Sequence, residues 1–308
     1  MAMPSLIPAE PVAPACAEAS LPTRLAARAV QALIEEAELT PKPGLVDRRG
    51  SGAHADLSLD LMLRSARSLF PCFRAIAETS LGRTPSQPLR ERLAAIGRDG
   101  ERAMFAATCG SNSHKGAIWA LGLLVSGSVL GPDLADAHAI AARAGGLARH
   151  PDSHTPQVPA NGSRVRQKYG VNGATGEAQA GFPHVVGIGL PALRRARSLG
   201  VPERCARLDA LLAIMAQLDD TCLLHRGGLQ ALHTAKRGAR QALKAGGASA
   251  PRGMRLLLRL DTDLLGLNAS PGGSADLLAA TLFLDSISNP SIQQPQFQHY
   301  GDAEPWKI

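Results

Sequence analysis

Ionisable side chains and glycines gather in a few short segments of a chain that otherwise has an apolar, helical pattern. The segments are TPKPGLVDRRGSGAHADL at 40–57, GSNSHKGAIWALGLL at 110–124, GVNGATGEAQAGFP at 170–183, LLAIMAQLDDTCLLHRGG at 211–228 and NASPGGSADLLAATLFL at 268–284. Their carboxylates, lysines, histidines and arginines are groups that bind phosphates and divalent cations. Taken together, rather than one by one, the segments predict a Mg²⁺–polyphosphate site.

The first segment is a turned loop that carries several ionisable side chains. Prolines flank Lys42 and a glycine follows, which stiffens the backbone and disfavours helix. Asp47 and Asp56 are candidates for binding Mg²⁺ or a ribose, and Lys42 for holding a phosphate, with His54 beside them. The alternative is an ordinary exposed connection, since turn-rich loops are usually polar.

The second and third segments place polar groups at the starts of helices. Ser113 can cap the helix that follows, so that the free N–H groups of its first turn, with Lys115 and His114, form an anion site. Glu177 stands at another helix start among glycines, where it complements the helix dipole or lies beside a ligand. No GxxxxGK[ST] sequence occurs, and an enzyme that uses ATP at its ribose does not need that cradle. A capped helix without a ligand is the alternative.

The fourth segment puts two carboxylates into a helix predicted over 203–225. Asp219 and Asp220 interrupt its apolar pattern, and a carboxylate on a core-facing stripe is costly unless it is paired or bound to a metal. At least one of the two should therefore face a polar cavity or an ion. His225 and Arg226 end the helix, where capping is the alternative role.

The fifth segment begins the last predicted helix. A proline after Ser270 is a strong helix start, and Gly272 and Gly273 leave the backbone of the first turn open to an anion. Asp276 then falls inside an apolar helix. Tight packing of the helix start against a neighbour explains the same residues equally well.

The elements that must position these residues are helices, because apolar residues recur at spacings of three and four and strand signals are nearly absent. We predict helices near 23–39, 58–79, 88–108, 114–127, 132–149, 176–197, 203–225, 228–245, 252–265 and 271–286. The polar stretch 150–175 is predicted as a binding loop or a lid. The expected fold is all-α: a single multi-helical domain over 21–288 with polar active-site loops at helix ends. A disordered segment over 1–20 precedes it and a tail over 289–308 follows it.

The composition limits the class of protein. Of 308 residues, 45% are hydrophobic and only 3% aromatic, and the net charge of +7 favours polyanionic partners. Aromatic residues interleaved with basic ones are missing, so nucleic acid is not expected as a partner. Five scattered cysteines without a CxxC pair argue against a disulfide framework and a structural zinc site. With no signal-peptide pattern and no apolar run of spanning length, we expect a cytoplasmic protein that does not enter a membrane.

The five segments, in this order, resemble the signature blocks of the triphosphoribosyl-dephospho-CoA synthase family across most of residues 25–287. The matching residues are Lys42, Asp47, His54, Asp56, Asn112, His114, Lys115, Glu177, Asp220, Thr221, His225, Arg226, Asn268, Ser270, Ser274 and Asp276. The chain departs from the pattern at Cys222, where the family has Asn, and at Ser111 and Ser113. Its Ala/Arg-rich, basic character is closer to the malonate decarboxylase branch than to the citrate lyase branch.

The resemblance implies an enzyme that moves the triphosphoribosyl group of ATP onto the 2′-hydroxyl of 3′-dephospho-CoA, releasing adenine, with Mg²⁺ as cofactor. The product would pass to a second transferase that acts on an acyl carrier protein, and a homodimer is possible. The implied metal ligands are Asp47, Asp56, Asp220 and Asp276. The implied catalytic groups are Glu177 as base, His114 as acid and Asp220. The implied substrate-binding residues are Lys42, His54, Asn112, Lys115, Arg226, Asn268, Ser270, Gly272, Gly273 and Ser274.

Two other functions stay open at this point. An ADP-ribosyl hydrolase-like enzyme would share the helices, the acids and Mg²⁺, and it would release adenine without needing dephospho-CoA. A non-catalytic helical module that binds a coenzyme would bind ATP and form no adenine.

Overall fold

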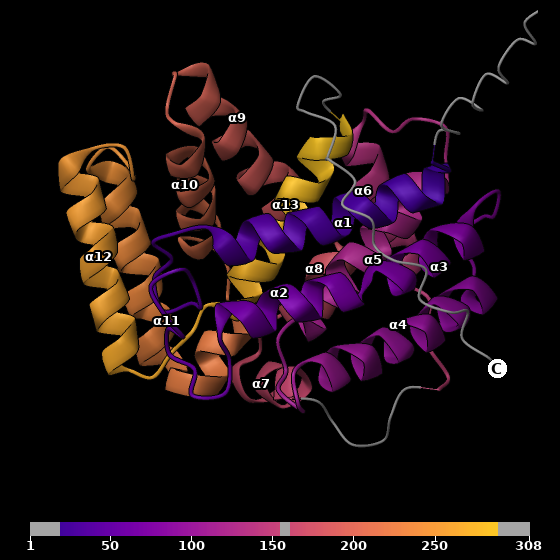
Figure 1. Ribbon diagram of the computed structural model, residues 1–308, viewed down its shortest axis with the longest axis horizontal. Helices are drawn as coiled ribbons and strands as arrows, with labels where there is room; N and C mark the ends of the chain where they lie inside the picture. The colour runs from indigo at the N-terminus through magenta and orange to yellow at the C-terminus, as the bar shows by residue number, and fades with distance from the viewer. Residues whose placement is uncertain (1–18, 155–160, 289–308) are drawn as a thin grey trace, which may run out of the picture.

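Two helices that are apolar around their whole circumference lie at the centre of the structure. The computed structural model describes residues 19–154 and 161–288. In α5 (Lys115–Val129) and α13 (Gly272–Ser288), nearly every residue after the first turn is buried, as expected for helices with neighbours on all sides. They pack against each other and against α1 (Leu21–Glu38), which crosses the front of the molecule in Figure 1.

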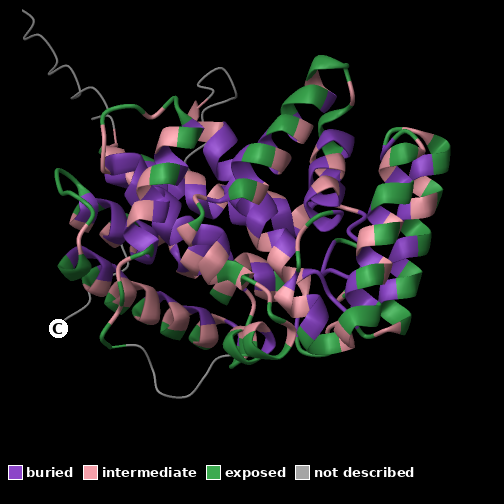
Figure 2. Cartoon of the chain, turned by 180° about the vertical axis from the view of Figure 1, so that it is seen from behind, coloured by how far each residue is buried: buried purple, intermediate pink, exposed green. Residues whose placement is uncertain are grey.

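The remaining helices surround this centre, and one core cluster of buried side chains runs through almost all of them. Figure 2 shows the buried residues concentrated in the middle and the exposed ones on the outer helix faces. The surrounding elements are α2 (Leu59–Ser68), α3 (Phe70–Ser80), α4 (Gln87–Ala107), α6 (Ala137–Ala148), α7 (Asn161–Tyr169), α8 (Gly173–Gln179), the π-helical turn η1 (Val185–Gly189), α9 (Leu190–Ser198), α10 (Glu203–Met215), α11 (Thr221–Lys244) and α12 (Pro251–Gly266). The described residues form no strand, only an isolated bridge between Asp47 and Gly50, so the predicted all-α fold is confirmed.

Several predicted helix boundaries are wrong, and each error has a local cause. The helix predicted over 58–79 divides at Leu69, where Pro71 in the first turn of α3 restarts it. The helix predicted over 176–197 divides between α8 and η1. The helix predicted from residue 132 begins only at Ala137, because Asp136 caps it.

Two further differences affect the site. The helix predicted over 203–225 ends at Met215, and a new helix begins after Asp220. The stretch 150–175, predicted as a loop, contains α7 and the start of α8. The predictions for 1–20 and 289–308 fall almost wholly on segments that lie outside the described residues. No helix of the described part of the chain is long and apolar enough to cross a bilayer.

Candidate functional site

Asp220 joins the starts of two helices. It is the N-cap of α11, where Oδ1 accepts from the N–H groups of Cys222 at 2.8 Å and Leu223 at 3.4 Å. Its Oδ2 accepts from the N–H and the hydroxyl of Ser274 at 2.7 and 2.8 Å, and Gly273 N–H also points to Oδ1 at 3.3 Å. The sequence predicted that Asp220 lies inside a helix, and this prediction is wrong. Asp220 instead connects the first turn of α13 to the first turn of α11 through hydrogen bonds.

Asp276 lies one turn further along α13 and faces the start of α5. A side chain at Gly116 would place its Cβ 2.0 Å from Asp276 Oδ2, so only glycine lets the carboxylate approach this helix end. Burial first, and then the negative charges of Glu36 and Asp220, raise the pKa of Asp276 well above its usual range. The Asp276 carboxyl is therefore a group that would gain from a nearby cation.

The predicted phosphate ligand Lys42 is buried and paired inside the protein. Its Nζ donates to Oε1 of Glu36 at 2.6 Å and to the carbonyl of Glu36 at 2.7 Å, and only 1% of the Lys42 residue is exposed. Sequence reasoning missed Glu36. The sequence feature that could have identified Glu36 is its position on the apolar stripe of α1, three residues after Leu33. A buried carboxylate at such a position needs a cation or a hydrogen-bond donor beside it.

His114 is buried beside this ion pair, and its imidazole ring carries a single described hydrogen bond. Its Nδ1 lies 2.8 Å from Ser65 Oγ, which in turn accepts from the hydroxyl of Ser113 at 2.7 Å. No other acceptor for the Ser65 hydroxyl is described, so we assign its proton to Nδ1 and the imidazole proton to Nε2, which has no described partner. Burial and then the charge of Lys42 lower the pKa of His114 to about 3, so the ring is neutral at pH 7.

A second cluster, nearer the surface, joins the first, fourth and fifth segments. Arg226 donates to His54 Nδ1 at 3.2 Å and to the carbonyl of Asn268 at 3.1 Å. His54 Nε2 lies 3.1 Å from the Oγ of Ser270, which stands two residues before the start of α13. Burial and then the charge of Arg226 lower the pKa of His54. Asp56, exposed, lies 3.7 Å from His54 Nδ1. The structure thus brings together residues of three segments that are far apart in sequence.

Asp47 belongs to a clamp that holds the 40–57 loop. Its Oδ2 accepts from the N–H of Lys42 at 2.8 Å and from Arg49 Nη2 at 2.7 Å. Arg49 also reaches Asp261 of α12 at 2.8 Å, and Asp261 accepts from the N–H of Gly44. Sequence reasoning missed Arg49 and Asp261, because neither stands out from the other charged residues of its segment.

Three further predicted residues, Glu177, Lys115 and Asn112, lie apart from these two clusters. Glu177 is buried in α8 and bonds His184 twice, through the backbone N–H at 2.8 Å and Nδ1 at 2.7 Å. Lys115 is exposed and pairs with Glu101 of α4 at 2.8 Å, while Asn112 Oδ1 accepts from the N–H of Lys115. None of these contacts joins them to Asp220 or Asp276.

The four acids predicted as metal ligands do not form one group. Across residues 19–154 and 161–288, no three His, Cys, Asp or Glu side chains come together in a way that could hold a metal ion. Asp47 forms an ion pair with Arg49, and both carboxylate oxygens of Asp220 accept hydrogen bonds from N–H and O–H groups of the protein. Asp276 is the member of the set that fits Mg²⁺ best, because Mg²⁺ in nucleotide sites uses one or two carboxylates together with phosphate oxygens.

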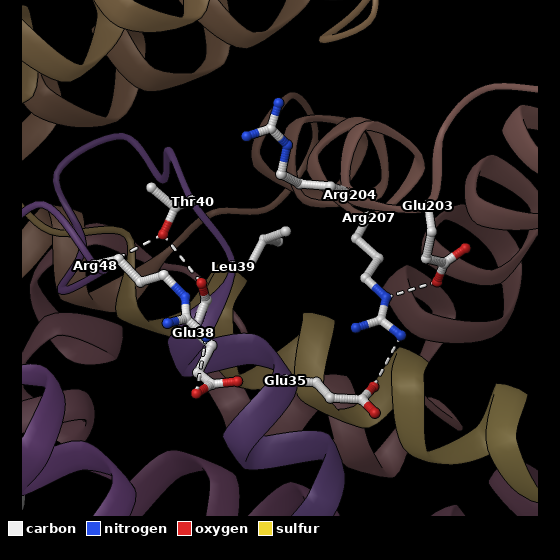
Figure 3. Close-up of a pocket in the computed structure, with 8 residues that line it drawn as sticks. All are labelled: Glu35, Glu38, Leu39, Thr40, Arg48, Glu203, Arg204 and Arg207. Atoms are coloured by element: carbon white, nitrogen blue, oxygen red, sulfur yellow. Dashed lines mark hydrogen bonds and ion pairs between the residues drawn. The ribbon is translucent and has the colours of Figure 1, made fainter. Parts of the chain in front are cut away.

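Two cavities open near these segments and differ in charge. The larger, about 540 Å³, lies between the end of α1 and the start of α10, and in Figure 3 Arg207 is bound by both Glu35 and Glu203. The smaller, about 380 Å³, lies between α7 and the first turns of α11, and basic side chains line it without any acid. The larger cavity holds none of the predicted site residues, whereas the smaller one includes His225.

Comparison with known proteins agrees with the resemblance of the sequence segments. A family model described as CitG: ATP:dephospho-CoA triphosphoribosyl transferase matches residues 22–294. A probable 2-(5″-triphosphoribosyl)-3′-dephosphocoenzyme-A synthase of Azotobacter vinelandii is 56% identical over 278 residues, which cover 90% of this chain and 95% of the relative. Proteins of the same printed name from Pseudomonas fluorescens Pf0-1 and Pseudomonas putida are 53% and 55% identical, over 90% and 88% of this chain and 96% of each relative.

No solved structure matches the chain significantly. The family match spans every helix described above, and the relatives align along nearly their whole length. These matches make the chain an enzyme of the triphosphoribosyl-dephospho-CoA synthase class, and it belongs to the CitG family.

Proposed function

We propose that this enzyme transfers the triphosphoribosyl group of ATP to the 2′-hydroxyl of 3′-dephospho-CoA and releases adenine. The bond between ribose C1 and the adenine nitrogen breaks, and a bond between C1 and the 2′-oxygen of the acceptor forms. The acceptor hydroxyl loses its proton to a base, and the departing adenine takes one up. The triphosphate stays intact, which agrees with the absence of a Walker A sequence from the whole chain.

The observation that carries the proposal is the meeting of the α5, α11 and α13 starts around Asp220 and Asp276. Bond breaking at C1 builds positive charge on the ribose, and a carboxylate beside C1 stabilises that charge. Mg²⁺, with Asp276 as the carboxylate of the chain, would supply charge neutralisation for the triphosphate. Asp220 keeps the two helix starts in place, and the Nε2–H of His114 is a buried donor for an acceptor atom of the substrate.

Proton transfer is assigned to the groups that the sequence singled out. Glu177, held by His184, is the proposed base for the acceptor hydroxyl. His114 is neutral, so it assists the leaving adenine by donating a hydrogen bond from Nε2, and the proton that adenine takes up comes from water. Burial, and then the charge of Lys42 in its pair with Glu36, keep His114 neutral.

The destination of the product is part of the same proposal. The triphosphoribosyl dephospho-CoA would pass in the cytoplasm to a second transferase that loads the acyl carrier protein of malonate decarboxylase or citrate lyase. The basic, Ala/Arg-rich composition supports the malonate decarboxylase system. A homodimer stays a prediction.

The deciding experiment measures adenine release from ATP and Mg²⁺ with and without 3′-dephospho-CoA, followed by the mass of the product. Adenine that forms only with the acceptor, together with a product heavier by one triphosphoribosyl unit, is the expected result. Adenine formed equally without the acceptor would instead mean a hydrolase. ATP binding with no adenine at all would mean a coenzyme-binding module.

A further inference from the structure

The cavity between α7 and α11 is basic, and its arginine and lysine form no ion pair with any residue of 19–154 or 161–288. Its lining residues are Arg164, Val165, Lys168, Tyr169, Leu224, His225 and Gly228. Arg164 and Lys168 are exposed, stand one helical turn apart on α7 and make no ion pair within the described part of the chain. The contact that the structure gives Lys168 is with the ring of Tyr169, at 5.0 Å. The larger cavity offers the contrast, because its Arg207 is already neutralised by two glutamates.

The opposite wall of the cavity is a break in α11. Gly228 has φ 61° and ψ −157°, so the helix is interrupted there, and the nearest atom to a Cβ built at Gly228 is the hydroxyl oxygen of Tyr169, at 3.5 Å. After such a break, the backbone N–H groups of the next residues no longer bond the carbonyl oxygens four residues earlier. These N–H groups can then donate to a ligand. His225 lies one residue before Arg226, which contacts His54 and Asn268.

α7 also reaches the helix start that Asp220 caps. A Cβ at Gly173 would lie 3.1 Å from Arg166 of α7 and 3.2 Å from Thr221 of α11, so these two residues flank the same glycine. Figure 1 shows α7 beside the lower end of α11. The helix that lines the cavity, α7, therefore also packs beside the first turn of α11, the turn that Asp220 caps.

We propose that this cavity, lined by Arg164, Lys168 and His225, binds the phosphate chain of one of the two nucleotide substrates. Arginine and lysine that lack an ion-pair partner among the described residues, next to a histidine and a tyrosine side chain, suit a ligand with several anionic oxygens. The inference rests on the proposed function for the identity of the ligand. It adds to the binding residues those of α7, a helix that lies in none of the five segments. ATP supplies a triphosphate and 3′-dephospho-CoA a diphosphate, and the experiment distinguishes them.

The test uses the full chain with Arg164→Gln and Lys168→Gln combined. The matched control combines Arg255→Gln and Arg259→Gln, which are exposed, spaced by one turn on α12 and free of described ion pairs. KM is measured for ATP at saturating dephospho-CoA, and for dephospho-CoA at saturating ATP. Inhibition by inorganic tripolyphosphate and by pyrophosphate is measured in parallel, and circular dichroism melting checks the fold of each variant.

The expected result is a rise in KM of about tenfold for one substrate, with kcat little changed and the control unaffected. A rise for ATP, with weaker inhibition by tripolyphosphate, assigns the cavity to the triphosphate. A rise for dephospho-CoA, with weaker inhibition by pyrophosphate, assigns it to the coenzyme. If both KM values stay within about twofold of the unsubstituted enzyme, or if the control changes equally, the inference is wrong. That outcome leaves the proposed function intact, because the unsubstituted enzyme still makes product.

Discussion

His114 is a buried donor whose charge state is fixed by its surroundings. The chain of hydroxyls from Ser113 through Ser65 ends on Nδ1, so the imidazole keeps its proton on Nε2. An unpaired buried N–H costs free energy until a partner arrives. A substrate atom that accepts from Nε2 would therefore be bound by an interaction whose geometry exists before binding.

The stability of the folded enzyme should fall on acidification in a way that depends on His114. The unfolded chain takes up a proton on this residue near pH 6.5, whereas the folded chain takes one up only near pH 3. Between these values the unfolded state binds more protons, so the free energy of unfolding falls as pH falls. From pH 6.5 to about pH 5 this residue alone should cost about 2 kcal/mol.

The measurement is urea unfolding of the unsubstituted enzyme and of His114→Asn across that range. Asp276 acts in the opposite direction, since its raised pKa makes the folded carboxyl take up a proton first and gain stability on acidification. Because Asp276 is present in both proteins, the difference between them isolates His114. If the free energy of unfolding changes equally with pH in the two proteins, His114 is not held neutral in the folded state.

At the scale of elements, a single carboxylate organises two helix starts. Asp220→Ala removes the cap of α11 and the acceptor for the N–H and hydroxyl of Ser274 in α13. We expect a loss of about 2 to 4 kcal/mol in the free energy of unfolding, because two caps are lost and buried donors stay unpaired. Activity should fall too, since both helix starts then lose their fixed relative position.

The neighbouring residue offers the control. Asp219 is exposed and pairs with Lys236 at the surface, so Asp219→Ala should cost no more than about 1 kcal/mol. Chemical denaturation of both variants, with adenine release as the second readout, gives the comparison. Equal effects from the two substitutions would contradict the role assigned to Asp220.

The same pair of residues shows how far the sequence could go. It flagged Asp219 and Asp220 as polar residues in an apolar pattern, which was correct, but it placed both inside one helix. Periodicity alone does not separate one long helix from two short ones joined by a turn, and the cap that divides them is paired with Ser274, far away in sequence. The helix α7 was predicted as a loop for a different reason: its residues are mostly polar and show little apolar periodicity.

The sequence singled out polar residues of the candidate site but did not identify their partners. His54, Arg226 and Ser270, from three different segments, lie within hydrogen-bond distance of one another, and their role in binding stays a prediction. Glu36 was overlooked because it stands outside those segments, in a helix whose pattern looks complete without it. Pairing across packed helices depends on tertiary contacts, and a single sequence does not contain them.

At the scale of the whole molecule, the excess of positive charge should govern encounter with both substrates. The net charge is +7, and Arg164 and Lys168 of α7 add basic side chains to the cavity against α11. ATP and dephospho-CoA are polyanions, so long-range attraction raises their association rates and salt screens it. We expect kcat/KM to fall several-fold, on the order of 3- to 10-fold, between about 20 mM and about 200 mM sodium chloride.

Steady-state kinetics at constant free Mg²⁺ and pH measures this dependence. The value of kcat at saturating substrates is the internal control, because it does not report encounter. A kcat/KM that is flat across the salt range, or a parallel loss in kcat, would mean that charge steering does not contribute.

The double attachment of Asp220 has a consequence for how the family can vary over evolutionary time. Its two oxygens serve the backbone of α11 and the Ser274 hydroxyl of α13, and a Cβ at Gly273 would lie 3.0 Å from the carboxylate. Because Asp220, Gly273 and Ser274 contact one another, a substitution at one of them alters the environment of the other two. We therefore expect positions 220, 273 and 274 to covary among members of the family.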